Sequence, residues 1–146
     1  MTIIKMTACH VPQIAELEKL CFHDPWSEKS IASELHNKLS NWLVAIDDDQ
    51  VVGYVGSQTV LGETDMMNIA IHPQYRKQGI ATALIHNLIE ILKEQNSHSL
   101  MLEVRRSNDA AKSLYMKMGF VEVGVRRNYY RNPKEDALIL RKEWNL

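Results

Sequence analysis

The sequence predicts one α/β (α+β) domain over residues 1–146, with a mixed, mostly antiparallel sheet, a central parallel β-α-β crossover and helices on both faces. Three observations predict this fold. A hydrophobic fraction of 45% over 146 residues is that of an ordinary globular chain. Segments with an apolar period of two stand on both sides of a long segment with a helical period. We find no repeat, low-complexity tract or Pro-, Gly- or Ser-rich linker that would separate two domains.

Composition argues against several classes of protein. Lys and Arg number 17 and Asp and Glu number 18, so the net charge of −1 gives no basic field for general nucleic-acid binding. Cys9 and Cys21 are too few for a disulfide framework, and neither they nor the six scattered His residues show the spacing of metal ligands. No run approaches the roughly 18 apolar residues of a membrane span, and the first ten residues lack the pattern of a signal peptide. We therefore expect a cytoplasmic protein that binds no metal, no membrane and no nucleic acid directly.

The N-terminal half predicts two helices and three strands of the sheet after a short first strand, TIIKM. Thr7 can cap a helix whose apolar positions are Ile14, Leu17, Leu20 and Cys21, and Ser27 can cap a short helix through Leu35. In the segments that follow, apolar residues recur at every second position, as in a strand. NWLVAI and VVGYVGSQTV predict a hairpin around the turn at residues 47–49, and ETDMMNIAIH predicts the next strand, which ends at His72-Pro73.

The C-terminal half starts with the strongest helical pattern, from Gly79 to about Gln95. One apolar stripe carries Ala81, Leu84, Ile85, Leu88, Ile89 and Leu92. The run SLMLEVR is typical of a strand covered on both faces, and a strand, a helix and a strand in series imply a parallel crossover. Asn108 or Ser107 can cap a further helix that ends at Gly119, and FVEVGVRRNYY and DALILRKEW predict two closing strands.

The loop before the long helix is a candidate anion site. A helix start leaves about four backbone N–H groups without internal partners and carries roughly half a positive charge. Gly79 and Ala81 are small enough for a diphosphate to approach the backbone of residues 76–81 closely. The alternative is a helix that simply begins with small residues. Neither GxxxxGK[ST] nor GxGxxG is present, so the loop matches no nucleoside-triphosphatase or dinucleotide pattern.

The tracts NIAIHPQYRKQGIATALI and LEVRRSNDAAKSLYMKMGF resemble the GNAT superfamily of acetyl-CoA-dependent N-acyltransferases. Arg76, Gly79 and Ala81 match the superfamily's Q/R-x-x-G-x-G/A loop. Four segments, PWSEKS, LEVRRSN, LYMKMGF and RRNYY, are similar to the ribosomal-protein-alanine N-acetyltransferases of the RimI type and together span most of the chain. The resemblance implies a GNAT-like fold and transfer of an acetyl group from acetyl-CoA to the α-amino group of an N-terminal alanine of the eighteenth small-subunit ribosomal protein.

The resemblance also implies which residues bind coenzyme A. The loop would bind the diphosphate mainly through backbone amides, and the strand before it would expose backbone groups to the pantetheine arm and to the oxyanion of the reaction. Asn108 is open between a helix cap and a contact with coenzyme A. The residues expected at the cofactor are Ile69, Ala70, Ile71, Arg76, Lys77, Gln78, Gly79, Ile80, Ala81, Thr82 and Asn108.

Glu103 and Tyr115 are the candidate catalytic residues. An amine attacks a thioester only as the free base, so one group must accept its proton and another should protonate the thiolate. By resemblance Glu103 is the acceptor, directly or through water, and Tyr115 the donor. We expect partial desolvation beside the apolar run to raise the pKa of Glu103. Taken alone, Glu103 could instead pair with Arg105, and Tyr115 could be a core aromatic.

The acceptor side of the site rests on aromatic residues. By resemblance Tyr129 and Tyr130 border the acceptor peptide, although either could be an ordinary strand aromatic, and Trp26 either walls the acceptor groove or packs before the Ser27 cap. The expected partner is the basic N-terminal segment of a ribosomal protein, bound by a monomer or weak homo-oligomer. Two other functions stay open: a lysine or polyamine N-acetyltransferase, and a non-catalytic module that binds acyl-CoA.

Overall fold

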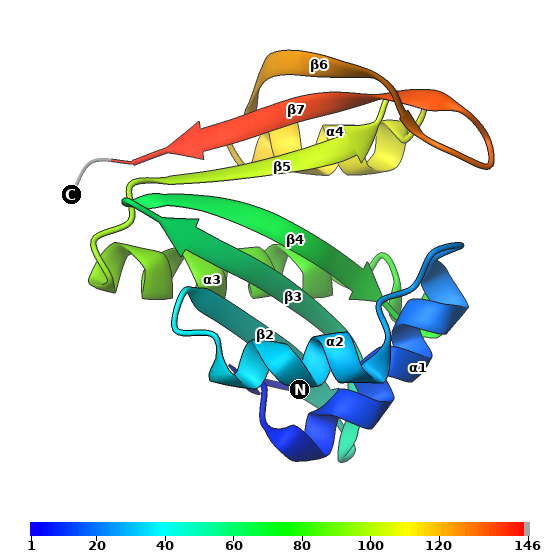
Figure 1. The fold of residues 1–146 in the computed structure, drawn as a ribbon, viewed down its shortest axis with the longest axis vertical. Helices are drawn as coiled ribbons and strands as arrows, with labels where there is room; N and C mark the ends of the chain where they lie inside the picture. Colours follow the sequence, from blue (N-terminus) through cyan, green and yellow to red (C-terminus); the bar gives the residue numbers. More distant parts are fainter. Residues whose placement is uncertain (145–146) are drawn as a thin grey trace.

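The computed structural model describes residues 1–144, in which seven strands form one sheet in the order β1-β2-β3-β4-β5-β7-β6 (Figure 1). All neighbouring strands are antiparallel except β4 and β5, as the sequence predicts for the crossover. The strands are β1 (Thr2–Lys5), β2 (Ser40–Asp47), β3 (Gln50–Val60), β4 (Glu63–Ile71), β5 (Ser99–Arg105), β6 (Val121–Tyr130) and β7 (Glu135–Glu143). The helices are α1 (Val11–Cys21), α2 (Glu28–Ser33), α3 (Ile80–Glu94) and α4 (Asp109–Lys117), with 3-10 turns at Ala8–His10, Glu34–His36 and Pro73–Tyr75.

β4 and β5 pair at one end only. Their parallel register joins Glu63–Asp65 to Ser99–Met101, and beyond that point the two strands diverge (Figure 1). A register shift in the pairing of β4 with β3 leaves Met67 as an extra residue, which bends β4 where the divergence starts. The sheet is therefore open toward the loop that precedes α3.

Helices cover the two faces of the sheet unequally. α3 and α4 lie on one face, where Leu84, Leu88 and Tyr115 share a buried core with residues of both halves of the sheet. α1 and α2 lie on the other face, and their core includes Trp42 and Tyr54 of β2 and β3. That second face is left without a helix over β5, β7 and β6 in the described chain (Figure 1).

This arrangement corrects the expectation that β5 is covered on both faces. Leu100, Leu102 and Val104 are buried in the core beneath the helices, whereas Met101, Glu103 and Arg105 on the opposite face are only half-buried. The run SLMLEVR looks continuous because Met101 is apolar, although only every second residue faces the core.

The long helix and its flanking turns are confirmed. In α3, five positions of the predicted stripe are fully or almost fully buried: Leu84, Ile85, Leu88, Ile89 and Leu92. Gly79 at its N-cap and Gly119 just after α4 have φ values of 79° and 94°, the left-handed region that glycine adopts without strain. The turn between β2 and β3 likewise has positive φ at Asp48 and Asp49, which is typical of a tight hairpin.

The start of α1 differs from the prediction. The Thr7 amide donates to His10 Nδ1 at 2.9 Å, so Thr7 begins the 3-10 turn, and α1 itself starts at Val11. Leu20 is 57% exposed, because the buried stripe of α1 continues through Glu18 instead. A carboxylate in an apolar stripe is the opposite of what a hydrophobic period predicts.

Candidate active site

The open edge of β4 presents backbone groups toward the diverging strand. The His72 amide bonds the Val52 carbonyl at 2.8 Å, and antiparallel pairs alternate, so the Ala70 backbone faces β3 while those of Ile69 and Ile71 face the open side. Of the three residues expected to meet the pantetheine arm through the backbone, this register favours Ile69 and Ile71.

The start of α3 fits a diphosphate sterically and electrostatically. The first helical hydrogen bond runs from the Ala83 amide to the Gly79 carbonyl at 3.0 Å, so the amides of Ile80, Ala81 and Thr82 have no acceptor inside the helix. Apart from the two chain neighbours of Gly79, no atom of residues 1–144 lies within 4 Å of a Cβ added there, so the space above this turn is open. Lys77 and Gln78 in the same loop are exposed.

The Arg76 side chain is engaged with β4. Its Nε donates to the Ile71 carbonyl at 3.3 Å, and its Nη2 lies 3.7 Å from Cys21 Sγ. Arg76 thus ties the loop to the end of the open strand.

Glu103 lies on the uncovered face of β5, directed toward β6. Arg126 Nε donates to its Oε1 at 3.1 Å, while its Oε2 is buried and has no hydrogen-bond partner among the described residues. The pairing with Arg105 that the sequence left open does not occur, because Arg105 pairs with Glu135 at 3.3 Å instead. The charge of Glu103 also acts on its neighbours: burial, together with the charges of Glu103 and Glu63, raises the pKa of Asp65.

Tyr129 and Tyr130 both lie beside Glu103, although successive residues of a regular strand point to opposite faces. Between the pairs Arg126↔Ala137 and Tyr130↔Glu135 the pairing of β6 with β7 shifts, and Asn128 there has a φ of 52°. This irregularity brings the two rings together, with centroids 5.1 Å apart. Burial and the nearby Glu103 charge raise the pKa of Tyr129, and the same causes raise the pKa of Tyr130 to about 12.

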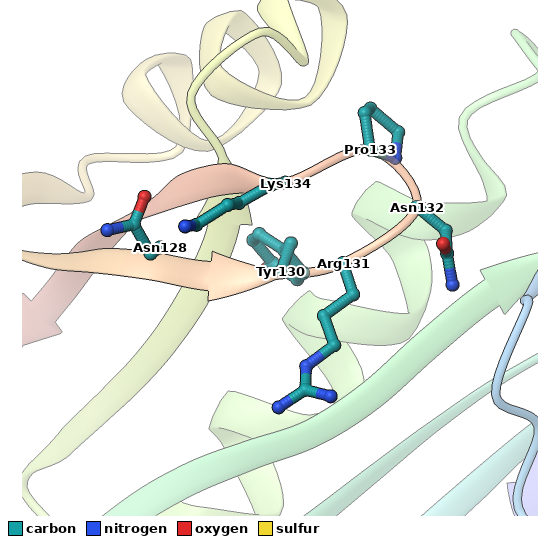
Figure 2. Close-up of a pocket in the computed structure, with 6 residues that line it drawn as sticks. All are labelled: Asn128, Tyr130, Arg131, Asn132, Pro133 and Lys134. Atoms are coloured by element: carbon teal, nitrogen blue, oxygen red, sulfur yellow. The ribbon is translucent and has the colours of Figure 1, made fainter.

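Arg105 organises the loop between β6 and β7. Its guanidinium donates to the carbonyls of Pro133 and Arg131, both at 2.9 Å, and lies 4.4 Å from the ring centroid of Tyr130. Figure 2 shows the hollow beside this loop, about 620 Å³ in volume, which is lined by Asn128, Tyr130, Arg131, Asn132, Pro133 and Lys134. The loop that borders the uncovered face of β5 is therefore fixed by a side chain from β5 itself.

Tyr115 is 7% exposed and belongs to the core beneath the sheet, with its ring 5.7 Å from that of Phe120. Burial raises the pKa of Tyr115 to about 12. Asn108 caps α4, because its Oδ1 accepts a hydrogen bond from the Ala111 amide at 3.2 Å.

Trp26 is half-buried at the start of α2. Its ring meets Trp42 edge-on with centroids 5.4 Å apart, and Trp42 in turn stacks on Tyr54 at 5.7 Å. The Trp26 amide donates to Oε1 of the buried Glu18 at 2.8 Å. Trp26 thus lies on the same face of the sheet as Glu103, on the opposite side of the divergence between β4 and β5.

Sequence reasoning missed several residues that shape this site: Glu18, Asn68, Arg105 and Arg126. Each acts through a contact across the fold, and no local pattern marks such a contact. The one local signal was Asn128 within a strand, since Asn adopts positive φ more readily than most residues. Residues 1–144 contain no cluster of three or more His, Cys, Asp or Glu that could hold a metal ion, and no helix long and apolar enough to cross a membrane.

Residues 11–120 match the sequence pattern of the acetyltransferase (GNAT) family. The chain belongs to this family. Among its curated relatives is the [ribosomal protein bS18]-alanine N-acetyltransferase of Escherichia coli (strain K12), 36% identical over 141 residues that make up 95% of each chain. The relative of the same name from Haemophilus influenzae is 38% identical over 144 residues, 96% of this chain and 97% of that one.

Solved structures agree with these sequence relationships. The crystal structure of the ribosomal-protein-S18-alanine N-acetyltransferase from Escherichia coli superposes on this GNAT acetyltransferase with a TM-score of 0.91 at 34% identity, covering 99% of this chain and 94% of that one. The predicted GNAT-like fold is therefore confirmed, and so is the resemblance to the RimI type. The protein is an acyltransferase enzyme.

Proposed function

We propose that this GNAT acetyltransferase transfers the acetyl group of acetyl-CoA to the N-terminal α-amino group of alanine on ribosomal protein bS18, in the cytoplasm. The names of its relatives, which are 36–38% identical over about 95% of the chain, support this acceptor. The observation that carries the reaction type is the position of Glu103. A buried carboxylate oxygen that accepts no hydrogen bond from residues 1–144, next to an open strand edge, suits the binding and deprotonation of an ammonium group.

The proposed donor site combines the loop before α3 with the open edge of β4. The amides of residues 80–82 would bind the diphosphate of acetyl-CoA, and the amide of Ile71 faces the side on which the thioester would lie, whereas the amide of Ile69 on the same side donates to Asn68 Oδ1. Acetyl-CoA supplies the activated acyl carbon when it is bound. The chain's own contribution is to hold that carbon still and to stabilise negative charge on its oxygen.

Glu103 would accept the proton of the incoming ammonium, directly or through a water molecule. An α-amino group suits this base better than a lysine side chain. The reference pKa values are about 7.7–8.0 and about 10.4, so freeing the lysine amine near neutral pH costs roughly 3.5 kcal/mol more. Arg126 on Glu103 Oε1 leaves Oε2 as the oxygen for the acceptor.

Tyr115 would assist the departing thiolate. With a pKa of about 12, against about 8.5 for a reference thiol, full proton transfer from Tyr115 costs roughly 5 kcal/mol. Tyr115 therefore acts chiefly by donating a hydrogen bond to the developing thiolate, which leaves as the thiol by taking up the second proton that the nitrogen loses after its attack. Trp26, Tyr129 and Tyr130 would enclose the first residue of the acceptor.

The test is Glu103→Gln, assayed by thiol release from acetyl-CoA with an alanine-starting basic peptide. We expect a steep loss of rate near neutral pH and an almost unchanged affinity for acetyl-CoA. Glu122→Gln on the exposed face of β6 is the matched control and should behave as wild type. An unaffected Glu103→Gln removes Glu103 from its role, and preference for a polyamine or a lysine side chain over the peptide removes the α-amine assignment.

A further inference from the structure

Glu18 is the most deeply buried carboxylate of the described chain, and the reaction proposed above does not use it. It lies on α1, is 1% exposed, and burial raises the pKa of its carboxyl group. Its two oxygens have different partners. Oε1 accepts from the Trp26 amide at 2.8 Å, and Oε2 accepts from Asn68 Nδ2 at 2.7 Å. One side chain therefore holds both the loop before α2 and the bent segment of β4.

Asn68 connects Glu18 to the open edge of β4. Its Oδ1 accepts from the Ile69 amide at 3.1 Å. Only one orientation of the Asn68 amide serves both neighbours, because Nδ2 must face the carboxylate and Oδ1 must face an N–H group. The chain of contacts from Trp26 through Glu18 and Asn68 to Ile69 thus has a fixed direction, in which every donor meets an acceptor.

We propose that Glu18 is a positioning residue for the transfer reaction, which sets the Ile69 amide and the Trp26 loop relative to each other through Asn68. The inference rests on the proposed function, since Ile69 lies on the donor side of the site and Trp26 on the acceptor side. The buried carboxylate is the hydrogen-bonded link between these two sides. An error of about 1 Å in such an alignment is enough to reduce a rate by two orders of magnitude.

The hydrogen-bond pattern gives a sharp test. In Glu18→Gln the new NH₂ group faces a donor, so either Trp26 loses its acceptor or Asn68 turns over and Ile69 loses its acceptor. In Asn68→Asp two carboxylates face each other. In the double variant, the new amide side chain at position 18 accepts from the Trp26 N–H and donates to the new carboxylate at position 68. That carboxylate accepts from the Ile69 N–H, so all three hydrogen bonds return.

Glu34→Gln is the matched control. Glu34 is also buried, and it accepts from two side-chain amides, those of Asn37 and Gln58. Its partners lie outside the chain of contacts that runs from Trp26 to Ile69. A general cost of replacing a buried carboxylate by an amide would therefore appear equally in Glu34→Gln and Glu18→Gln.

Rates of acetyl transfer to the alanine-starting peptide should fall by about tenfold or more in each single variant, the effect of one charge-assisted hydrogen bond, and should largely recover in the double variant. Glu34→Gln should keep the wild-type rate, although its melting temperature should be close to that of Glu18→Gln. The proposal is wrong if the double variant is no better than the worse single variant, or if Glu18→Gln matches Glu34→Gln in rate.

Amide hydrogen exchange of Trp26 and Ile69, measured without any substrate, separates this inference from the proposed function. Exchange at one of the two amides should speed up in Glu18→Gln and return to the wild-type value in the double variant. A wild-type protein inactive on the peptide would refute the proposed function, and the exchange pattern would still decide whether the Glu18 network exists. Unchanged exchange in Glu18→Gln would overturn the network itself.

Discussion

Arg105 should control the binding of the acceptor without affecting that of acetyl-CoA. Its guanidinium donates to two carbonyls of the loop between β6 and β7, pairs with Glu135 at 3.3 Å and covers the ring of Tyr130 at 4.4 Å. Arg105→Lys keeps the charge but replaces a planar fork by a single ammonium, which cannot reproduce all of these contacts. At least one charged hydrogen bond is lost.

The magnitude follows from the number of bonds and their exposure. A hydrogen bond to a charged group contributes about 1.5–3 kcal/mol, and the Arg105 side chain is 30% exposed, so we reduce the loss to about 1–2 kcal/mol. If the loss falls on the acceptor site, the KM for the peptide rises roughly 5- to 30-fold. The KM for acetyl-CoA should stay unchanged, because Arg105 contacts no residue of the loop before α3 in the described structure.

Initial rates with the peptide varied at saturating acetyl-CoA, and then with acetyl-CoA varied, measure both constants. Arg106→Gln is the matched control. Arg106 pairs with Asp136 of β7 at 3.6 Å, but its side chain is 55% exposed, so its loss should change neither constant measurably. Equal rises in the two KM values for Arg105→Lys, or a peptide KM no higher than that of Arg106→Gln, would refute the reasoning.

Three further outcomes are expected. A Cβ at Gly56 would lie 2.4–2.6 Å from ring atoms of Trp42, so Gly56→Ala should reduce the free energy of unfolding by about 1–3 kcal/mol. Gly124→Ala is the control: a Cβ there would lie 3.4 Å from its nearest neighbour, so thermal unfolding should change little. Because the pKa of Tyr115 is about 12, its phenol should stay protonated as the pH rises to about 10. A pH–rate profile that falls near pH 8–9 in the wild type but not in a variant without Tyr115 would contradict its role as a neutral donor. Gly79→Ala should reduce the free energy of unfolding by about 1 kcal/mol, because the φ of residue 79 is positive. Calorimetry should show a larger loss in the free energy of coenzyme A binding, since the new methyl group would occupy the open space in which the ligand lies.

The sequence predicts the parts of the fold that depend on local periodicity. The stripe of α3, the hairpin after Asp47 and the cap at Gly119 are where the pattern places them, and of the two candidate caps of α4 the structure uses Asn108. It does not predict the bend of β4 at Met67, because the extra residue exists only relative to the register of β3. For the same reason the buried position of Glu18 was not foreseen, since its partners come from segments 8 and 50 residues away.

The residues of the candidate site likewise fall into those that a local sequence pattern marks and those that it does not. A helix start with small residues has a local signature, which made the loop a candidate anion site, and the resemblance assigned residues 76–82 to the diphosphate. Glu103 and Tyr115 came from the resemblance, and their partners did not follow from either source. Arg105, the alternative partner of Glu103 on its own strand, pairs with Glu135, while Arg126 of β6 pairs with Glu103. The arginine that pairs with Glu103 therefore comes from another strand, and spacing along β5 does not predict it.

The pair of strands β4 and β5 is open at one end and closed at the other, where hydrogen bonds hold Glu63–Asp65 beside Ser99–Met101. There the hydroxyl of Thr64 bonds those of Thr59 at 2.7 Å and Ser97 at 2.8 Å, and Trp144 Nε1 donates to the Ser97 carbonyl at 2.7 Å. These contacts are largely buried, so they hold β3, β4 and the segment entering β5 together where the parallel pairing exists. The bend at Met67 then separates the strands within a few residues, and the outward backbone groups of β4 lose the neighbour that a completed sheet would provide. Backbone groups at such an edge need other partners. In the proposed reaction, a ligand with amide groups of its own, lying between β4 and β5, would pair with the groups that Asn68 and Arg76 do not already engage, so the position of the closed end would determine where the thioester binds.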